Sequence, residues 1–184
     1  MTHFSPPCYD RRTIGLHWVS VALVMFLWCG AHTIDWFPKG PARVDARSVH
    51  IVTGLVLLGV CLFRIHWRLT GGVRIEAAPG WIERLARHVH LLLYGLLLAT
   101  LGLGLGNAWL RGDSLFGVVR IPPYGDLSLT RRHDLAEQLT AIHSLSANVL
   151  LLIAIGHAAM ALYHHVVLDD GLLRRMMTPR QDQD

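Results

Sequence analysis

The stretch His143-Ser-Leu-Ser-Ala-Asn-Val-Leu-Leu-Leu-Ile-Ala-Ile-Gly-His157 is an apolar run with a histidine at each end. In an α-helix, the spacing of fourteen residues turns the second histidine to within about 40° of the first and carries it about 21 Å along the axis. Nothing else in the run is ionisable, and ionisable side chains inside a membrane are costly enough to indicate function. One helix face therefore presents two imidazoles at two depths.

The composition is that of a membrane protein. Of the 184 residues, 52% are hydrophobic and 16% are charged, which is unusual for a soluble domain. The first apolar run follows Arg11-Arg12 and continues to Ala31 without a small-x-small cleavage site, so we expect a retained span rather than a signal peptide. The formal net charge of +4 comes from arginine, with Lys39 the only lysine. We do not expect so apolar a chain to bind nucleic acid.

Four apolar segments are each long enough to cross a hydrocarbon core of about 30 Å, for which about 20 helical residues suffice. They cover approximately residues 13–34, 48–67, 88–109 and 135–166. Arg64, His66 and Arg68 close the second span, and the glycine-rich run Leu101–Gly106 in the third indicates close approach of a neighbouring helix. The pattern predicts an all-α, integral membrane, four-helix up-down bundle. It comprises an N-terminal tail (1–12), a membrane domain (13–168) and a C-terminal tail (169–184).

An even number of spans puts both termini on the same side of the membrane. Placing both in the cytoplasm puts more of the 17 lysine and arginine residues inside than outside, as the positive-inside rule favours. The outer side still carries several cations, among them Lys39, Arg43 and Arg47.

Alternating helix directions pair four histidines at two depths. His17 lies with His157 near the inner face, and His50 lies with His143 near the outer face. A b-type haem between helices takes two axial imidazoles, so the pairs predict two haems separated by on the order of 20 Å. The alternative for any one of these residues is a hydrogen-bonded or snorkelling histidine at a span end. A zinc site would need four ligands converging on one point, and no C-x-x-C-H motif is present for covalent haem attachment.

Further histidines lie near the span ends. His88 and His90 are two residues apart, face different directions and are interpreted as interfacial. His164 is seven residues from His157 on nearly the same stripe, which makes it a candidate for proton exchange beside the inner haem. Snorkelling at the inner boundary is the alternative for both His164 and His165.

An ordered set of short motifs resembles the bacterial cytochrome b561 family over nearly the whole chain. The motifs are Ile14-Gly-Leu-His-Trp18, Val49-His50, His90-Leu-Leu-Leu-Tyr94, Ile142-His143, Gly156-His157-Ala-Ala, His164-His165 and Leu172-Leu-Arg-Arg-Met-Met177. The resemblance implies a four-helix protein of the bacterial inner membrane that holds two haem b groups. It also implies that His17, His50, His143 and His157 are the axial ligands.

Within that family, the chain is similar to small members that act as superoxide:ubiquinone oxidoreductases. Such an activity would take electrons from superoxide outside and deliver them to ubiquinone near the inner haem, where the position matching His164 lies. Outer arginines and Lys39 would then attract the small anion. The alternative is a membrane-anchor cytochrome b subunit that passes electrons from a periplasmic partner dehydrogenase or hydrogenase to quinone. A haem-free transporter is a third reading, but the spans lack paired carboxylates.

Overall fold

A computed structural model describes residues 8–72, 80–123 and 125–178, so the predicted tails at 1–12 and 169–184 lie partly outside the described residues. Within these ranges the chain is almost wholly helical. The elements are α1 (Arg11–Thr33), the 3-10 turn η1 (Ile34–Trp36), α2 (Pro41–Thr70), α3 (Trp81–Arg111), strands β1 (Ser114–Leu115) and β2 (Val119–Arg120), α4 (Leu129–Val166) and the 3-10 turn η2 (Arg174–Met176).

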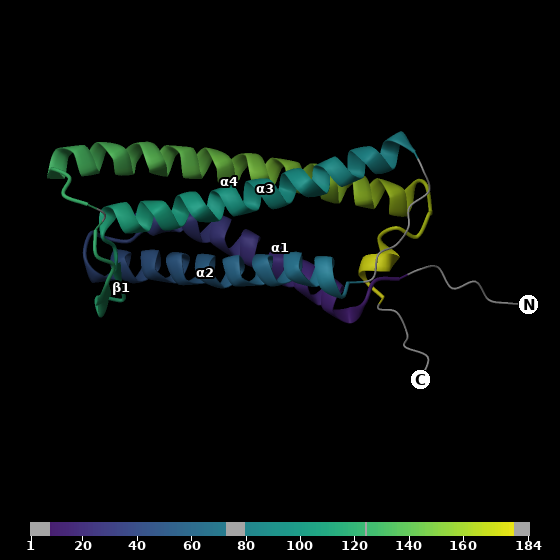
Figure 1. Cartoon of the computed structure of the whole chain (residues 1–184), viewed down its shortest axis with the longest axis horizontal. Helices are drawn as coiled ribbons and strands as arrows, with labels where there is room; N and C mark the ends of the chain where they lie inside the picture. The colour runs from purple at the N-terminus through teal and green to yellow at the C-terminus, as the bar shows by residue number, and fades with distance from the viewer. Residues whose placement is uncertain (1–7, 73–79, 124, 179–184) are drawn as a thin grey trace, which may run out of the picture.

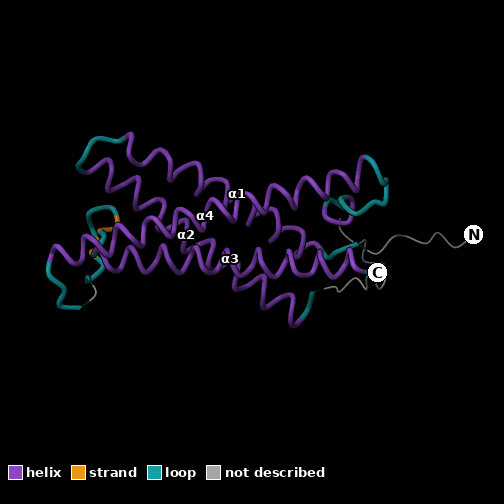
Figure 2. The backbone as a smooth tube through the Cα atoms, turned by 90° about the horizontal axis from the view of Figure 1, so that it is seen from above, coloured by secondary structure: helices purple, strands orange, loops and turns teal. Residues whose placement is uncertain are grey.

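The four long helices run up and down along one axis (Figures 1 and 2). α1 packs mainly on α2 and α3 mainly on α4, while α2 and α3 join the two pairs. We call the end that carries the β-hairpin the hairpin end, and the end where α1 begins and α4 ends the terminal end. The predicted all-α four-helix up-down bundle is confirmed.

The helix ends are fixed by capping residues outside the apolar runs. The carboxylate of Asp10 accepts a hydrogen bond from the backbone N–H of Thr13 (2.9 Å) at the start of α1. Ser128 caps α4 in the same way. Pro41 begins α2, in the first turn, where a backbone N–H would have no hydrogen-bond partner within the helix. Gly112, with φ of 66°, ends α3 in the left-handed region that favours glycine.

These caps make the helices longer than the apolar spans. α2 begins at Pro41 rather than at about residue 48, and α4 begins at Leu129 rather than at about residue 135. The reason is that hydropathy marks where a helix would enter lipid. The hydrogen-bond ladder begins earlier, at the first-turn proline Pro41 in α2 and after the capping side chain of Ser128 in α4.

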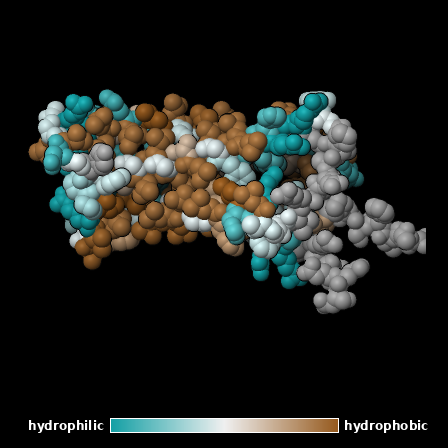
Figure 3. Space-filling view, in the orientation of Figure 1, coloured by the Kyte–Doolittle hydropathy of each residue, from teal (hydrophilic) through white to brown (hydrophobic). Residues whose placement is uncertain are grey.

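The apolar surface of the bundle faces outward. Few side chains are fully buried, and the buried cluster consists of Leu27, Leu57, Cys61, Leu97 and Leu150. Figure 3 shows hydrophobic side chains covering the middle of the molecule, with hydrophilic ones gathered toward both ends. All four long helices are long and apolar enough to span a membrane. Because such a belt is stable only against lipid, the chain is a multi-pass membrane protein.

A buried serine fastens the hairpin to α2. The Ser48 hydroxyl accepts from the backbone N–H of Phe116 (2.8 Å), and its single hydrogen is available to the carbonyl oxygen of Val44 (2.7 Å) or that of Ser114 (3.1 Å). Beside it, Arg47 forms an ion pair with Asp113 (3.2 Å). The long connection after α3 is thus anchored across the hairpin end of the bundle.

Candidate functional site

A fourteen-residue register runs through all four helices and marks two layers of side chains. Each helix contributes one residue to a layer near the hairpin end and another, fourteen positions away, to a layer near the terminal end. The pairs are Ala31 and His17 on α1, His50 and Arg64 on α2, Gly104 and His90 on α3, and His143 and His157 on α4. Fourteen helical residues separate the layers by about 21 Å.

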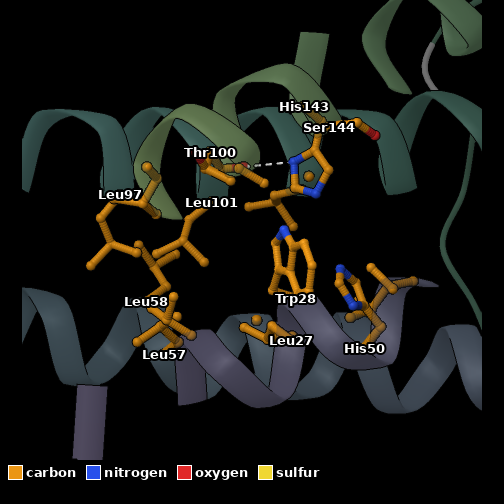
Figure 4. Close-up of a pocket in the computed structure, with 18 of the residues that line it drawn as sticks. Leu27, Trp28, His50, Leu57, Leu58, Leu97, Thr100, Leu101, His143 and Ser144 are labelled. Atoms are coloured by element: carbon orange, nitrogen blue, oxygen red, sulfur yellow. Dashed lines mark hydrogen bonds between the residues drawn. The ribbon is translucent and has the colours of Figure 1, made fainter. Parts of the chain in front are cut away.

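In the hairpin-end layer, two predicted site residues face each other across a cavity. The imidazoles of His50 and His143 have ring centroids 6.3 Å apart and an interplanar angle of 83°. The cavity is about 380 Å³ and is lined from all four helices, with Ala31 and Gly104 in its wall. Figure 4 shows the two rings on opposite sides of this pocket, which is otherwise lined largely by leucines.

The geometry of this pair suits a metal that binds both rings. An ion held by two imidazole nitrogens, each at about 2 Å, places the ring centroids roughly 6 Å apart. Nδ1 of His143 lies 2.9 Å from the carbonyl oxygen of Thr100, which only accepts, so Nδ1 carries the proton. Nε2 of His143 is therefore left with a free lone pair. Nδ1 of His50 is buried and has no hydrogen-bond partner among the described residues.

Gly104 permits the position of His143. A Cβ built at residue 104 would lie 3.0 Å from Cε1 of His143 and 3.3 Å from its Nδ1, closer than side chains normally approach. The glycine-rich run predicted close helix approach but did not single out this residue. Gly104 lies fourteen positions from His90, and this spacing is the sequence signal that could have identified Gly104.

Hydroxyl groups hold α3 and α4 together around this layer. The hydroxyls of Thr100 and Ser146 lie 2.6 Å apart, and Thr140 accepts from Asn107 (2.9 Å) and Arg111 (2.7 Å). These hydrogen bonds cross between α3 and α4, so they fix the height of His143 against Thr100 and Gly104.

The terminal-end layer contains three imidazoles and a guanidinium. The rings of His90 and His157 lie 5.1 Å apart between centroids, at an interplanar angle of 68°. Arg64 donates from Nη2 to Nδ1 of His17 (2.9 Å), and His17 is within electrostatic range of His157 and His90. The predicted pair His17 and His157 therefore lies in one layer, together with two residues that the sequence analysis did not place there.

Those two residues correct the sequence interpretation. His90 was expected at the membrane boundary, yet its ring packs against His157 inside the bundle. Arg64 was expected to close a span, yet its guanidinium lies over the ring of Tyr94, 5.3 Å from the centroid. The spacing of residues within one helix gives the depth of a side chain in the membrane, but it does not show which face of the helix packs against a neighbouring helix. The inward positions of His90 and Arg64 were therefore not predicted. His88, in contrast, is exposed and bonds through Nδ1 to the carbonyl oxygen of Arg84.

His164 lies two turns beyond His157 and contacts the C-terminal segment. Its Nδ1 is 2.5 Å from Oδ2 of Asp170, and the other carboxylate oxygen accepts from the backbone N–H of Leu172 (2.9 Å). The hydrogen bond from His164 lowers the pKa of Asp170 below its ordinary value. Nearby, the indole of Trp18 donates to the carbonyl oxygen of Met176 (2.9 Å), so this segment is fastened to both α1 and α4.

Two imidazoles are too few to hold a bare metal ion. Within residues 8–72, 80–123 and 125–178, no group of three or more histidine, cysteine, aspartate or glutamate side chains could do so. Paired imidazoles instead suit iron that brings its own in-plane nitrogen ligands, as in haem. A membrane bundle with histidines paired at one depth and repeated at another belongs to the class of b-type membrane cytochromes.

Comparison with known proteins identifies the family. Residues 8–179 match the family model described as prokaryotic cytochrome b561. The chain belongs to this family, whose members bind haem b and transfer electrons in membranes.

Individual relatives match almost from end to end. The chain is 32% identical over 185 residues to a protein of Cereibacter sphaeroides named cytochrome b562, covering 95% of this chain and 98% of that one. It is 30% identical to a Yersinia pestis protein named probable superoxide oxidase CybB, covering 94% and 97%. It is 27% identical to cytochrome b561 homolog 1 of Escherichia coli (strain K12), covering 94% and 98%.

Proposed function

We propose that this chain transfers electrons across the bacterial inner membrane, using one haem b at each layer. His50 and His143 would be the axial ligands at the hairpin end, and His17 and His157 those at the terminal end. The observation that carries the proposal is the facing pair of His50 and His143, together with the second layer, fourteen residues further along α4, in which His17 and His157 lie. When bound, the two haems supply one-electron redox chemistry at two depths.

The protein's part at the hairpin end is to orient ligands and exclude water. The Thr100 carbonyl holds His143 in the tautomer that leaves Nε2 for iron. Leu27, Leu57 and Leu97 are buried and line the cavity, which keeps the surroundings apolar. A protein tunes the reduction potential of a haem through the low dielectric constant of its pocket and the orientation of its imidazole ligands.

The proposed electron donor is superoxide, at the hairpin end facing the periplasm. Each superoxide gives up one electron and becomes dioxygen. Lys39, Arg120 and Arg131 are exposed at this end and would draw in a small anion. Arg43 and Arg47 contribute less, because they pair with Asp35 and Asp113. The relative named probable superoxide oxidase CybB supports this assignment.

The proposed acceptor is ubiquinone, near the terminal-end layer and the cytoplasm. Its reduction takes two electrons and two protons, so a group that exchanges protons with water must lie nearby. His164 is the candidate, because its hydrogen bond to the partly exposed Asp170 connects it to the aqueous side. Both termini would then lie in the cytoplasm.

Stopped-flow mixing of the purified, haem-loaded protein with potassium superoxide tests the donor assignment. We expect rapid haem reduction that superoxide dismutase abolishes and that slows as salt shortens the Debye length from about 30 Å at 0.01 M to about 8 Å at 0.15 M. Lys39→Gln and Arg131→Gln should slow it further, while Arg174→Gln, exposed at the opposite end, should not. Haems that stay oxidised in superoxide would reject this donor.

A second candidate function rests on the protruding hairpin. Val118 is 85% exposed at its tip, beyond the Ser48 anchor, and Arg120 follows it. Such a tip could dock a periplasmic dehydrogenase or hydrogenase subunit for which this chain would be the membrane anchor. Purification from native membranes distinguishes the two: a large redox subunit that accompanies the wild type and is lost in Val118→Asp supports the anchor role.

A further inference from the structure

Arg64 is a cation within a membrane span, and it has no anionic partner among residues 8–72, 80–123 and 125–178. It lies in the second half of α2, and its guanidinium contacts the Nδ1 of His17 and the face of Tyr94. None of the ion pairs among the described residues includes Arg64. Charged side chains at membrane depth are costly unless paired, so this position calls for a negative group.

Its neighbours in the layer cannot supply that charge. The fourteen-residue register places Arg64 with His17, His90 and His157, all of which are neutral or positive. Their rings lie on three different helices around it, so the layer combines a cation and three imidazoles. Since no described side chain in the layer supplies the anion, its place suits the carboxylate of a bound molecule.

The present contact of Arg64 is also incompatible with ligation by His17. A guanidinium only donates, so in this contact Nδ1 of His17 is the acceptor and Nε2 carries the proton. A neutral imidazole that binds iron through Nε2 carries its proton on Nδ1 instead. Ligation by His17 therefore frees Arg64 from this hydrogen bond, while Tyr94 still offers its ring face to the guanidinium.

We propose that Arg64 binds a propionate carboxylate of the haem in the terminal-end layer. This inference rests on the proposed function, because it presupposes a haem held by His17 and His157. The guanidinium fork matches a carboxylate in two parallel hydrogen bonds, which an ammonium does not. The propionate would neutralise a charge that the described residues leave unpaired.

Haem binding by variants tests the proposal without measuring activity. Arg64→Met should weaken the terminal-end haem about tenfold to a hundredfold, as loss of a charged hydrogen-bonded pair does, and should leave the hairpin-end haem in place as the control for folding. Arg64→Lys should give an intermediate affinity, because it keeps the charge but loses the two parallel hydrogen bonds of the guanidinium. Arg68→Met, one turn further along α2 and exposed, should bind both haems as the wild type does.

Reconstitution of the full chain with haem dimethyl ester, whose propionates are uncharged, completes the test. The wild type should lose affinity for the ester by the same factor that Arg64→Met loses for haem. Arg64→Met should bind the ester as tightly as it binds haem, because the variant already lacks the guanidinium that would pair with the propionate. Equal discrimination against the ester by both proteins, or full haem retention in Arg64→Met, would overturn the inference. A wild type without haem would overturn the proposed function itself.

Discussion

At the scale of single residues, Gly104 determines where the imidazole ring of His143 can lie, because glycine has no side chain. Because a Cβ at Gly104 would lie 3.0 Å from His143, Gly104→Ala should displace that imidazole, at a cost of about 1–3 kcal/mol for overpacking. We expect the hairpin-end haem to bind about tenfold to a hundredfold more weakly, measured by haem titration. Gly102→Ala is the matched control, since a Cβ there meets nothing within 4 Å. Equal haem affinity in the two variants would refute this role for Gly104.

The terminal-end layer offers more imidazoles than one haem needs. If His17 and His157 are the axial pair, His90→Ala should keep two haems per chain, while His157→Ala should keep one. The visible spectrum of each reduced variant gives the count. Loss of a haem in His90→Ala with retention in His17→Ala would show that the pair is His90 and His157, whose rings are in contact.

At the scale of elements, the C-terminal segment around η2 is fastened by a contact that depends on pH. Because the pKa of Asp170 in the folded protein lies below its ordinary value of 3.8, the ionised carboxylate stabilises the docked segment. This contribution is complete above about pH 4 and is lost as pH falls through the lowered pKa. The segment should therefore detach only in strong acid.

A spin label reports this detachment. With the native cysteines replaced and a label introduced at Met177→Cys, the label should be restricted at neutral pH and become more mobile only as the pH falls through the lowered pKa of Asp170. In an Asp170→Asn background it should already be mobile at neutral pH, and its mobility should no longer change in acid. An immobile label in both proteins at every pH would show that the contact between His164 and Asp170 does not hold the segment.

The elements also show what the sequence could and could not predict. The number of helices, their direction and the common depth of His50 and His143 followed from apolar length and spacing. The inward positions of His90 and Arg64 did not, because they depend on how α2 and α3 rotate against α1 and α4. The early start of α4 was missed because Ser128 caps it within a polar stretch.

At the scale of the whole molecule, the apolar belt fixes the axis of the bundle in the membrane but not its direction. The excess of arginine near the terminal end predicts that both termini are cytoplasmic. With the native cysteines replaced, Lys39→Cys should react with an impermeant thiol reagent in intact cells. Thr178→Cys should react only after the membrane is permeabilised. The reverse pattern would place the hairpin end in the cytoplasm and the terminal end in the periplasm, which contradicts the proposed positions of the superoxide and quinone sites.

The central claim is that four histidines hold two haems, one pair in each layer. The most direct measurement is a pyridine haemochrome count on the purified full-length chain and its single variants. We expect two haems per wild-type chain, one per chain in His143→Ala with the terminal-end haem kept, and one in His157→Ala with the hairpin-end haem kept. A colourless wild type, or two haems remaining in His143→Ala, would contradict the account.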